Sequence, residues 1–254
     1  MPQPPNVLSG AMVWMASLLT LLAVWIVAAA LTDPLILPGP LRVMEVIGRE
    51  AASGELLRHL GVTLYRVLLS FVLAMSLGVM IGLLMGLRPR VDRFLDLWLV
   101  FFLNLPALVV MILAYIWLGP TEVAAILAVM INKVPNVVVT VREGARALDP
   151  KLAEMARVFR MPRGRVLRHV VMPQMAPFIA AAARSGIALI WKIVLVVELL
   201  GRGSGVGFKL HLHFQQFEID AILAYALAFI AVMQMVEWGV LRPLERRANR
   251  WRHA

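Results

Sequence analysis

The fold class of this chain is decided by Val67–Leu87, VLLSFVLAMSLGVMIGLLMGL. This run carries no charged side chain and is as long as the stretch of about 20 apolar residues that a lipid-spanning helix needs. The whole chain of 254 residues is 61% hydrophobic and 16% charged, whereas a soluble domain is about 45–50% apolar and about 25% charged. This composition excludes an ordinary soluble globule, a disordered chain and a nucleic-acid-binding arm.

Further runs of similar length and polarity flank this one. We therefore expect an all-α integral membrane protein with a single transmembrane domain, 11–241, and about six spans at 11–31, 66–87, 97–119, 123–140, 173–200 and 221–241. Residues 1–10 hold no Lys or Arg, and the first run is longer than the apolar core of a signal peptide. We therefore expect a span there rather than a cleaved leader.

The basic residues indicate how the spans are oriented. With residues 1–10 in the cytoplasm, the inside segments hold 16 Lys and Arg and the outside loops hold 5. The positive-inside rule then predicts that both termini, the long loop 141–172 and the basic tail 242–254 are cytoplasmic. The net charge of +10 follows from this topology and requires no nucleic-acid partner.

The loop 141–172 is the longest connection on the predicted cytoplasmic side, and its pattern predicts helices. The dipeptide Asp149-Pro150 is a helix start, with an acidic N-cap followed by proline at the first helical position. After it, apolar residues recur at i, i+3, i+4 and i+7, which are Leu152, Met155, Ala156 and Phe159.

A turn is expected near the middle of this loop. Pro162 and Gly164 predict it at Met161–Gly164, with a second short helix from Arg165 toward Pro173. The polar side of the hairpin is rich in arginine, and two interpretations stay open on the pattern alone. One is a basic amphipathic helix on anionic lipid, and the other is a helical hairpin that docks into a partner's groove.

Two short motifs in this loop resemble the EAA signature of binding-protein-dependent ABC permeases. Glu154-Met155-Ala156-Arg157 is followed, at the signature's spacing, by Val170-Val171-Met172-Pro173. Met155 replaces the first Ala, and Arg160 stands where the family has a bend-forming Gly, so the bend is expected to shift to Met161–Gly164. The resemblance implies coupling helices that contact a separate ATPase through Glu154, Met155, Ala156, Arg157, Phe159, Arg160, Gly164 and Pro173.

Motifs outside the loop resemble the nitrate/sulfonate/taurine branch of these permeases. They are Leu37-Pro38-Gly39-Pro40, Thr63-Leu64-Tyr65-Arg66, Gly78 with Gly82 and Gly86, Asn104-Leu105-Pro106, Trp117-Leu118-Gly119, and the series Arg184, Trp191, Glu198 and Gly201 to Gly207. The resemblance covers most of the chain and implies the type I ABC importer permease fold in a bacterial cytoplasmic (inner) membrane. The three glycines at four-residue spacing form one smooth helix face, which predicts close helix packing.

The resemblance implies a permease subunit and not an enzyme. Its expected partners are two ABC ATPase subunits, which bind ATP and Mg, a periplasmic solute-binding protein, a second copy in a homodimer, and the lipid bilayer. No cofactor is expected in this chain, because Gly203–Leu210 lacks the hydroxyl residue that ends a phosphate-binding loop. No metal site is expected, because the chain has no cysteine and His211 with His213 lacks a third ligand nearby.

The implied cargo is a small anionic solute, such as a sulfonate, taurine or a nitrate-like ion, that passes from the binding protein to the cytoplasm. Two alternatives stay open. One is a permease of the same superfamily for an uncharged solute such as a pyrimidine vitamin precursor. The other is a stand-alone secondary transporter built from inverted repeats.

Charged and helix-breaking residues within the spans are the candidates for a substrate path or gate. Each charge in hydrocarbon costs about 2.5–3.5 kcal/mol, so Arg184, Lys192 and Glu198 must face the bundle or water. Arg184 and Glu198 are too far apart along one helix to pair, so their partners are expected on other helices or in a second copy. Lys192 is expected in a hydrated cavity that attracts anions. The full candidate set is Asn104, Pro106, Arg184, Trp191, Lys192, Glu198, Gly205 and Gly207.

Each candidate also has a structural interpretation, which the sequence leaves open. Arg184 and Glu198 would then join helices, and Pro106 and Pro135 would form packing kinks. The glycines of 201–207 would be a flexible exit from the fifth span, whereas the functional alternative is a tight turn on the outside face that forms part of a gate.

Overall fold

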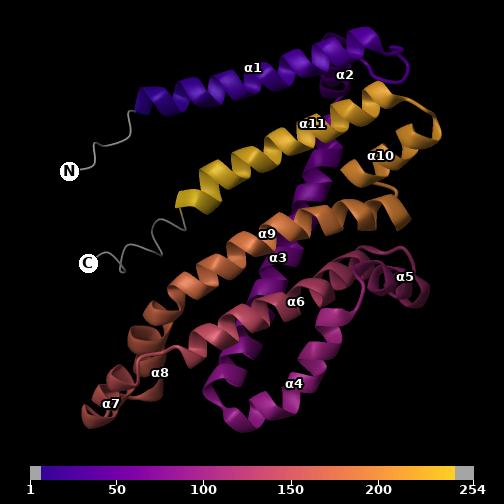
Figure 1. Cartoon of the computed structure of the whole chain (residues 1–254). Coiled ribbons are helices and arrows are strands. Elements are labelled where there is room, and N and C mark those ends of the chain that lie inside the picture. The colour runs from indigo at the N-terminus through magenta and orange to yellow at the C-terminus, as the bar shows by residue number, and fades with distance from the viewer. Residues whose placement is uncertain (1–6, 244–254) are drawn as a thin grey trace.

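The computed structural model describes residues 7–243, and helices joined by short turns make up almost all of that part (Figure 1). The expected N-terminal segment 1–10 and basic tail 242–254 lie largely outside it. The helices are α1 Val7–Leu31, α2 Pro40–Ala52, α3 Glu55–Leu87, α4 Pro89–Asn104, α5 Ala107–Leu118, α6 Glu122–Arg146, α7 Pro150–Val158, α8 Arg163–Val166, the π-helical η1 Leu167–Val171, α9 Met172–Gly201, α10 Val206–Gln215, α11 Ile219–Val236 and the π-helical η2 Glu237–Leu241.

Five helical stretches within residues 7–243 are long and apolar enough to cross a membrane, namely α1, α3, α6, α8 through α9, and α11 with the start of η2. The expected span 97–119 is instead divided into α4 and α5, which meet at 94° and complete the expected six only if the pair counts as one span. Proline explains the break. Pro106 has no backbone N–H, and it holds Leu105 in the extended conformation, so the helix stops at Asn104.

Helices α3 and α6 pack closely along the glycine face of α3. A Cβ on Gly78 would stand 2.6 Å from Val137 Cβ, and one on Gly82 would stand 2.8 Å from Val141 Cβ. The residue numbers of the contacts rise in the same direction along the two helices, so α3 and α6 run parallel. The close packing predicted from the four-residue glycine spacing is confirmed.

The bundle has two distinct ends (Figure 1). The α7 end carries the protruding α7 and α8, and the α10 end gathers α2, α5, α10 and the start of α3. Helices α2 and α10 lie in segments where the sequence pattern predicts only connecting loops. Helix α9 runs from the α7 end to the α10 end, so its charged residues lie at different depths in the bundle.

Candidate functional site

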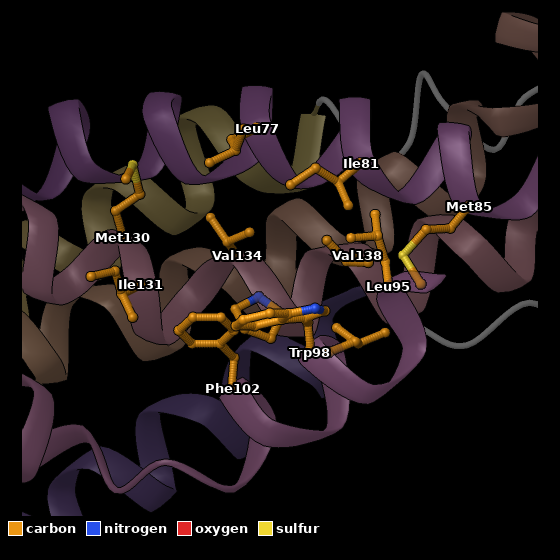
Figure 2. A pocket seen from close by; sticks show the side chains of 12 residues that line it. Leu77, Ile81, Met85, Leu95, Trp98, Phe102, Met130, Ile131, Val134 and Val138 are labelled. Atoms are coloured by element: carbon orange, nitrogen blue, oxygen red, sulfur yellow. The ribbon is translucent and has the colours of Figure 1, made fainter. Parts of the chain in front are cut away.

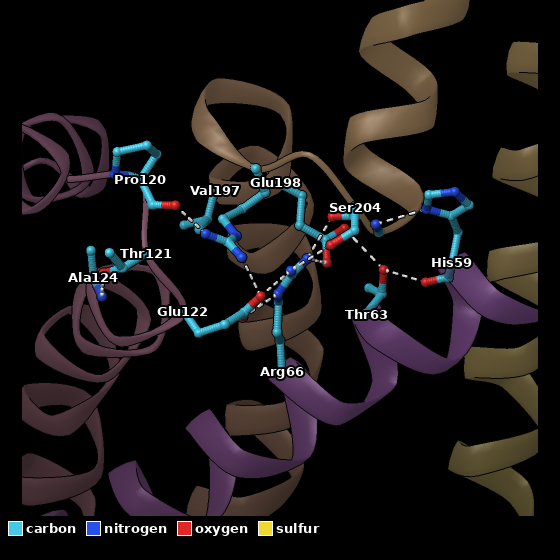
Figure 3. Close-up of polar contacts among 12 residues, drawn as sticks. His59, Thr63, Arg66, Pro120, Thr121, Glu122, Ala124, Val197, Glu198 and Ser204 are labelled. Atoms are coloured by element: carbon cyan, nitrogen blue, oxygen red, sulfur yellow. Dashed lines mark hydrogen bonds and ion pairs between the residues drawn. The ribbon is translucent and has the colours of Figure 1, made fainter.

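A buried polar network at the α10 end is centred on Arg66 of α3 (Figure 3). Its guanidinium donates to Glu198 Oε1 of α9 at 2.7 Å and to both carboxylate oxygens of Glu122 at 2.6 and 2.8 Å. It also donates to the Ser204 carbonyl at 2.6 Å. One arginine therefore ties α3, α6, α9 and the turn after α9 together.

Glu198 is fully buried, and its carboxylate is hydrogen-bonded on both oxygens. Besides the contact with Arg66, Oε2 accepts from Thr63 Oγ1 at 2.9 Å and from the Gly207 N–H at 2.9 Å. The expectation that Glu198 finds its partners on another helix is confirmed. Three donors from α3 and α10 converge on this carboxylate, so Glu198 links α9 to both of these helices.

The glycine-rich turn after α9 is packed against this carboxylate. Gly205 has φ +107, and a Cβ there would overlap the Glu198 carboxylate. A Cβ on Gly207 would overlap the Leu195 carbonyl oxygen. The Gly205 N–H donates to His59 Nδ1 at 2.9 Å. The turn is tight, so the interpretation as a flexible exit is wrong.

A second arginine closes the network toward the α5–α6 turn. Arg202 donates to Glu122 and to the Pro120 carbonyl. Thr121 caps α6, since its Oγ1 accepts from the Ala124 N–H at 3.2 Å, and this cap places Glu122 in the first turn. Two arginines thus balance two glutamates, Glu122 and Glu198. Sequence reasoning did not predict these pairs, because their members lie far apart along the chain.

A second polar surface lies on the neighbouring helices α6 and α9, where Asn136 is exposed and Asn132 and Thr140 are half-buried. On α9, Arg184, Ser185 and Lys192 are exposed. On α6, polar side chains recur every four residues, and each donates to the carbonyl one turn earlier. We call this surface the α6–α9 polar face and define it as Asn132, Asn136, Thr140, Arg184, Ser185 and Lys192.

The remaining pore candidates are dispersed. Asn104 is exposed at the end of α4, where its side chain donates to the Val100 carbonyl at 2.8 Å, and Pro106 precedes α5. Trp191 is half-buried and packs on Phe229, with ring centroids 5.6 Å apart. The Lys192 ammonium lies 5.4 Å from the centroid of the Trp191 ring. The structure therefore separates Glu198, Gly205 and Gly207 from the exposed cations.

The predicted coupling hairpin is present at the α7 end. Asp149 caps α7 by accepting from the Lys151 N–H at 2.8 Å, as predicted. Five of the candidate coupling residues on and after α7 are exposed: Glu154, Met155, Arg157, Phe159 and Arg160.

Two details of this hairpin differ from the expectation. Ala156 is buried, so the outer apolar surface of α7 consists of Met155, Val158 and Phe159, with Leu152 at its edge 37% exposed. The bend lies at Phe159–Pro162, and Arg160 itself adopts the left-handed conformation, with φ +47. The expected shift of the bend to Met161–Gly164 is therefore wrong.

The second arm of the hairpin is continuous with the next span. Gly164 lies inside α8 in open space, so it is not the turn residue. Pro173 is the second residue of α9, directly after the π-helical turn η1. The predicted short helix is therefore α8 with η1, and it leads directly into α9.

An apolar cavity of about 340 Å³ lies between α3, α4 and α6 (Figure 2). Trp98 and Phe102 of α4 face Val134 of α6 across it. The lining suits an acyl chain or an apolar side chain and cannot stabilise a charged solute. Within residues 7–243, no group of three or more His, Asp or Glu side chains is arranged to hold a metal ion.

Comparison with known proteins gives a family match over residues 74–240 to the binding-protein-dependent transport system inner membrane component. The putative aliphatic sulfonates transport permease protein SsuC of Bacillus subtilis is 31% identical over 95% of this chain and 89% of that protein. The taurine transport system permease protein TauC of Escherichia coli is 30% identical over 92% and 88%. The bicarbonate transport system permease protein CmpB of Synechococcus elongatus is 28% identical over 85% and 82%.

Solved structures support the fold. A chain of the MetNI methionine ABC transporter in an inward-facing conformation superposes with a TM-score of 0.64, at 16% identity, over 77% of this chain and 98% of that chain. A chain of an amino acid ABC transporter gives a TM-score of 0.63, at 21% identity, over 79% and 97%. The fold expected from the sequence is confirmed.

Proposed function

Because this chain belongs to the family of binding-protein-dependent transport system inner membrane components, we propose that it is the permease subunit that passes a small anionic solute in an ATP-driven importer. The observation that carries the anionic part of this proposal is the α6–α9 polar face. Its two cations, Arg184 and Lys192, stand on a membrane-spanning helix beside a row of amide and hydroxyl side chains.

Lipid is an unfavourable neighbour for this face. Each charge in hydrocarbon costs about 2.5–3.5 kcal/mol, whereas water or another polar surface removes much of that cost. A second copy related by a two-fold axis would bring two such faces together, and the space between them would be a hydrated path lined with positive charge. We therefore propose a homodimer with the solute path between the copies.

The relatives are consistent with an anion as cargo. Their names assign them aliphatic sulfonates, taurine and bicarbonate, and each of these solutes carries a negatively charged group. A positively charged path would concentrate such solutes as a binding protein releases them. An uncharged pyrimidine precursor would gain nothing from Arg184 and Lys192.

The exposed surface of α7 is the proposed contact with the ATPase. Met155, Val158 and Phe159 form a protruding apolar patch, and Glu154 and Arg157 flank it. An apolar helix face of this kind fits a groove in a protein partner. ATP and Mg would be bound by that partner, and the α7 end would lie in the cytoplasm, with the binding protein at the α10 end.

Hydrolysis of ATP by the reconstituted complex tests this proposal. The complex of this chain, the ATPase and the binding protein is placed in lipid vesicles, and sulfonates, taurine, bicarbonate, nitrate and an uncharged pyrimidine are supplied in turn. We expect stimulation of hydrolysis by the loaded binding protein with an anion. Stimulation by the pyrimidine alone would contradict the anionic cargo, and no stimulation by any loaded protein would contradict coupling to a binding protein.

The variant Glu154→Lys tests the contact with the ATPase. It reverses a charge on an exposed helix face, so the chain should insert into the membrane normally while stimulated hydrolysis is lost. Glu154→Gln keeps the shape of the side chain and should retain an intermediate rate. Wild-type stimulation in Glu154→Lys would show that α7 does not dock there.

A further inference from the structure

Lys133 is a lysine in the interior of the bundle that the proposed function does not use. It lies on α6 near the middle of the helix, and only 2% of its surface is exposed. Gly186 of α9 makes room for it, since a Cβ there would stand 3.2 Å from Lys133 Cε. Phe71 and Met75 of α3 approach the same point at 3.5 and 3.9 Å. Three helices therefore enclose this side chain.

Within residues 7–243 the Lys133 ammonium has no hydrogen bond or ion pair, and the side chains that meet it near Gly186 are apolar. The buried glutamate of the neighbouring helix, Glu198, is bonded to Arg66 instead. With only 2% of its surface exposed, Lys133 is poorly solvated, and a purely structural lysine would offset that cost by finding an acceptor. The missing acceptor therefore calls for a different explanation.

A second polar group without a hydrogen-bond partner, Ser70 Oγ, lies one helical turn from the level of Lys133. Gly78 of α3 stands opposite Val137 of α6, so one turn earlier Ala74 stands opposite Lys133. Ser70 is one further turn toward the α10 end, and its buried Oγ has no hydrogen-bond partner. Side chains on a helix lean toward its N-terminus, which for α6 is the α10 end. The Lys133 side chain is therefore long enough to reach the level of Ser70.

We infer that Lys133 and Ser70 form an anion-binding site that opens when α6 and α9 separate during the transport cycle, and that it takes the negatively charged group of the solute. This inference rests on the proposed function. Asn132, the residue before Lys133, is part of the α6–α9 polar face, so a gap between α6 and α9 opens from that face onto the lysine. Gly186 offers no side chain to block the gap.

Because Lys133 lacks a partner, the open and closed arrangements differ in their affinity for an anion. In the closed arrangement, the unpaired ammonium raises the free energy of the protein. In the open arrangement, an anion pairs with Lys133 and accepts from Ser70, so the solute binds the open state more tightly than the closed one. A ligand shifts an equilibrium only through such a difference in affinity. The site thereby links the arrival of an anion to the separation of α6 and α9.

Cysteine accessibility tests the opening of this site. The chain contains no cysteine, so Lys133→Cys provides a single reactive thiol. The complex with ATPase and binding protein is treated in vesicles with methanethiosulfonate ethylsulfonate, which is itself a sulfonate. We expect protection at rest and labelling during ATP hydrolysis. Val137→Cys lies one turn away on the side opposite to Ser70 and is equally buried, and it should stay protected throughout.

Either of two labelling results would contradict the inference. Protection of Lys133→Cys in a complex that hydrolyses ATP would overturn the inference. Equal labelling of Val137→Cys would show a general loosening of the bundle and would overturn it as well.

Lys133→Met tests the role of the charge. Methionine keeps the length of the side chain and removes an unpaired buried ion, so the thermal midpoint should stay the same or rise. Uptake of the anion should fall about tenfold or more, as expected when a charge-assisted contact is lost. A lower thermal midpoint would indicate a structural lysine, and uptake at the wild-type rate would exclude an anion contact. If the wild type imports no anion, the proposed function fails, whatever Lys133 does.

Discussion

Helix α9 carries charges in two opposite environments. At the α10 end, Glu198 is fully buried, and with Glu122 it balances Arg66 and Arg202 inside one chain. Nearer the middle of the same helix, Arg184 and Lys192 are exposed on the α6–α9 polar face. The difference separates two uses of charge in a membrane protein. Charges that are balanced in the buried network hold helices together, whereas Lys192, exposed at membrane depth, indicates a polar neighbour outside the chain.

The glycines of the two regions follow the same division. Gly205 and Gly207 are required because the Glu198 carboxylate and the Leu195 carbonyl occupy the space of a side chain. In contrast, Gly203 lies in the same turn with nothing within 4 Å of a Cβ. The buried network therefore specifies the backbone around it, and the open part of the turn does not.

Removal of the buried carboxylate should have the largest effect on stability. Glu198→Ala leaves Arg66 buried without one of its counter-charges, and breaking a buried pair in this way costs about 3–5 kcal/mol. We expect little folded protein in detergent and a lower thermal midpoint. The double variant Glu198→Ala with Arg66→Met should recover part of the loss, because no lone charge stays buried. Wild-type stability of Glu198→Ala would show that the network does not hold the helices.

Crowding at the glycine turn should have the next largest effect. Gly207→Ala places a methyl group on the Leu195 carbonyl oxygen, and overpacking of this kind costs about 1–3 kcal/mol. Gly203→Ala is the matched control in the same turn and should be tolerated. Thermal unfolding of the two purified variants makes the comparison, and equal stability would contradict the packed turn.

A substitution in the hairpin at the α7 end should have the smallest effect on stability. The left-handed conformation of Arg160 costs about 1–2 kcal/mol. A glycine at this position would avoid that strain but would lose about 0.5–1 kcal/mol in backbone entropy on folding. Arg160→Gly should therefore stabilise the hairpin by up to about 1 kcal/mol and slow amide exchange at Phe159–Pro162. Arg163→Gly removes a helical arginine from α8 and should act in the opposite direction. Faster exchange in Arg160→Gly would contradict this account.

Local patterns predicted much of the fold. The apolar runs located the spans, Asp149 located the start of α7, and the spacing of Gly78, Gly82 and Gly86 predicted the contact with α6. Each of these signals lies within one segment, so a single sequence is enough to show it. The angle between α4 and α5 was not predicted, because Pro106 indicates a break but not its 94° geometry.

The site was harder to predict, since it is assembled from distant residues. Nothing in the sequence pairs Arg66 with Glu122 and Glu198, although Thr63-Leu64-Tyr65-Arg66 was singled out for its resemblance to a family motif. Ala156 fitted the apolar stripe of α7, but its small side chain is covered in the hairpin. Lys133 was not singled out either, because its burial depends on α3 and α9 packing against α6 and not on its neighbours in the sequence.

Uptake of a labelled anion tests the central claim most directly. Vesicles containing the complex, with ATP inside and binding protein outside, are compared for the wild type, Lys192→Met and Lys192→Arg. We predict ATP-driven uptake by the wild type, a loss of about tenfold or more in Lys192→Met with the complex still assembled, and substantial uptake by Lys192→Arg, which keeps the charge. Wild-type uptake by Lys192→Met, or uptake of an uncharged pyrimidine precursor and of no anion, would contradict the account.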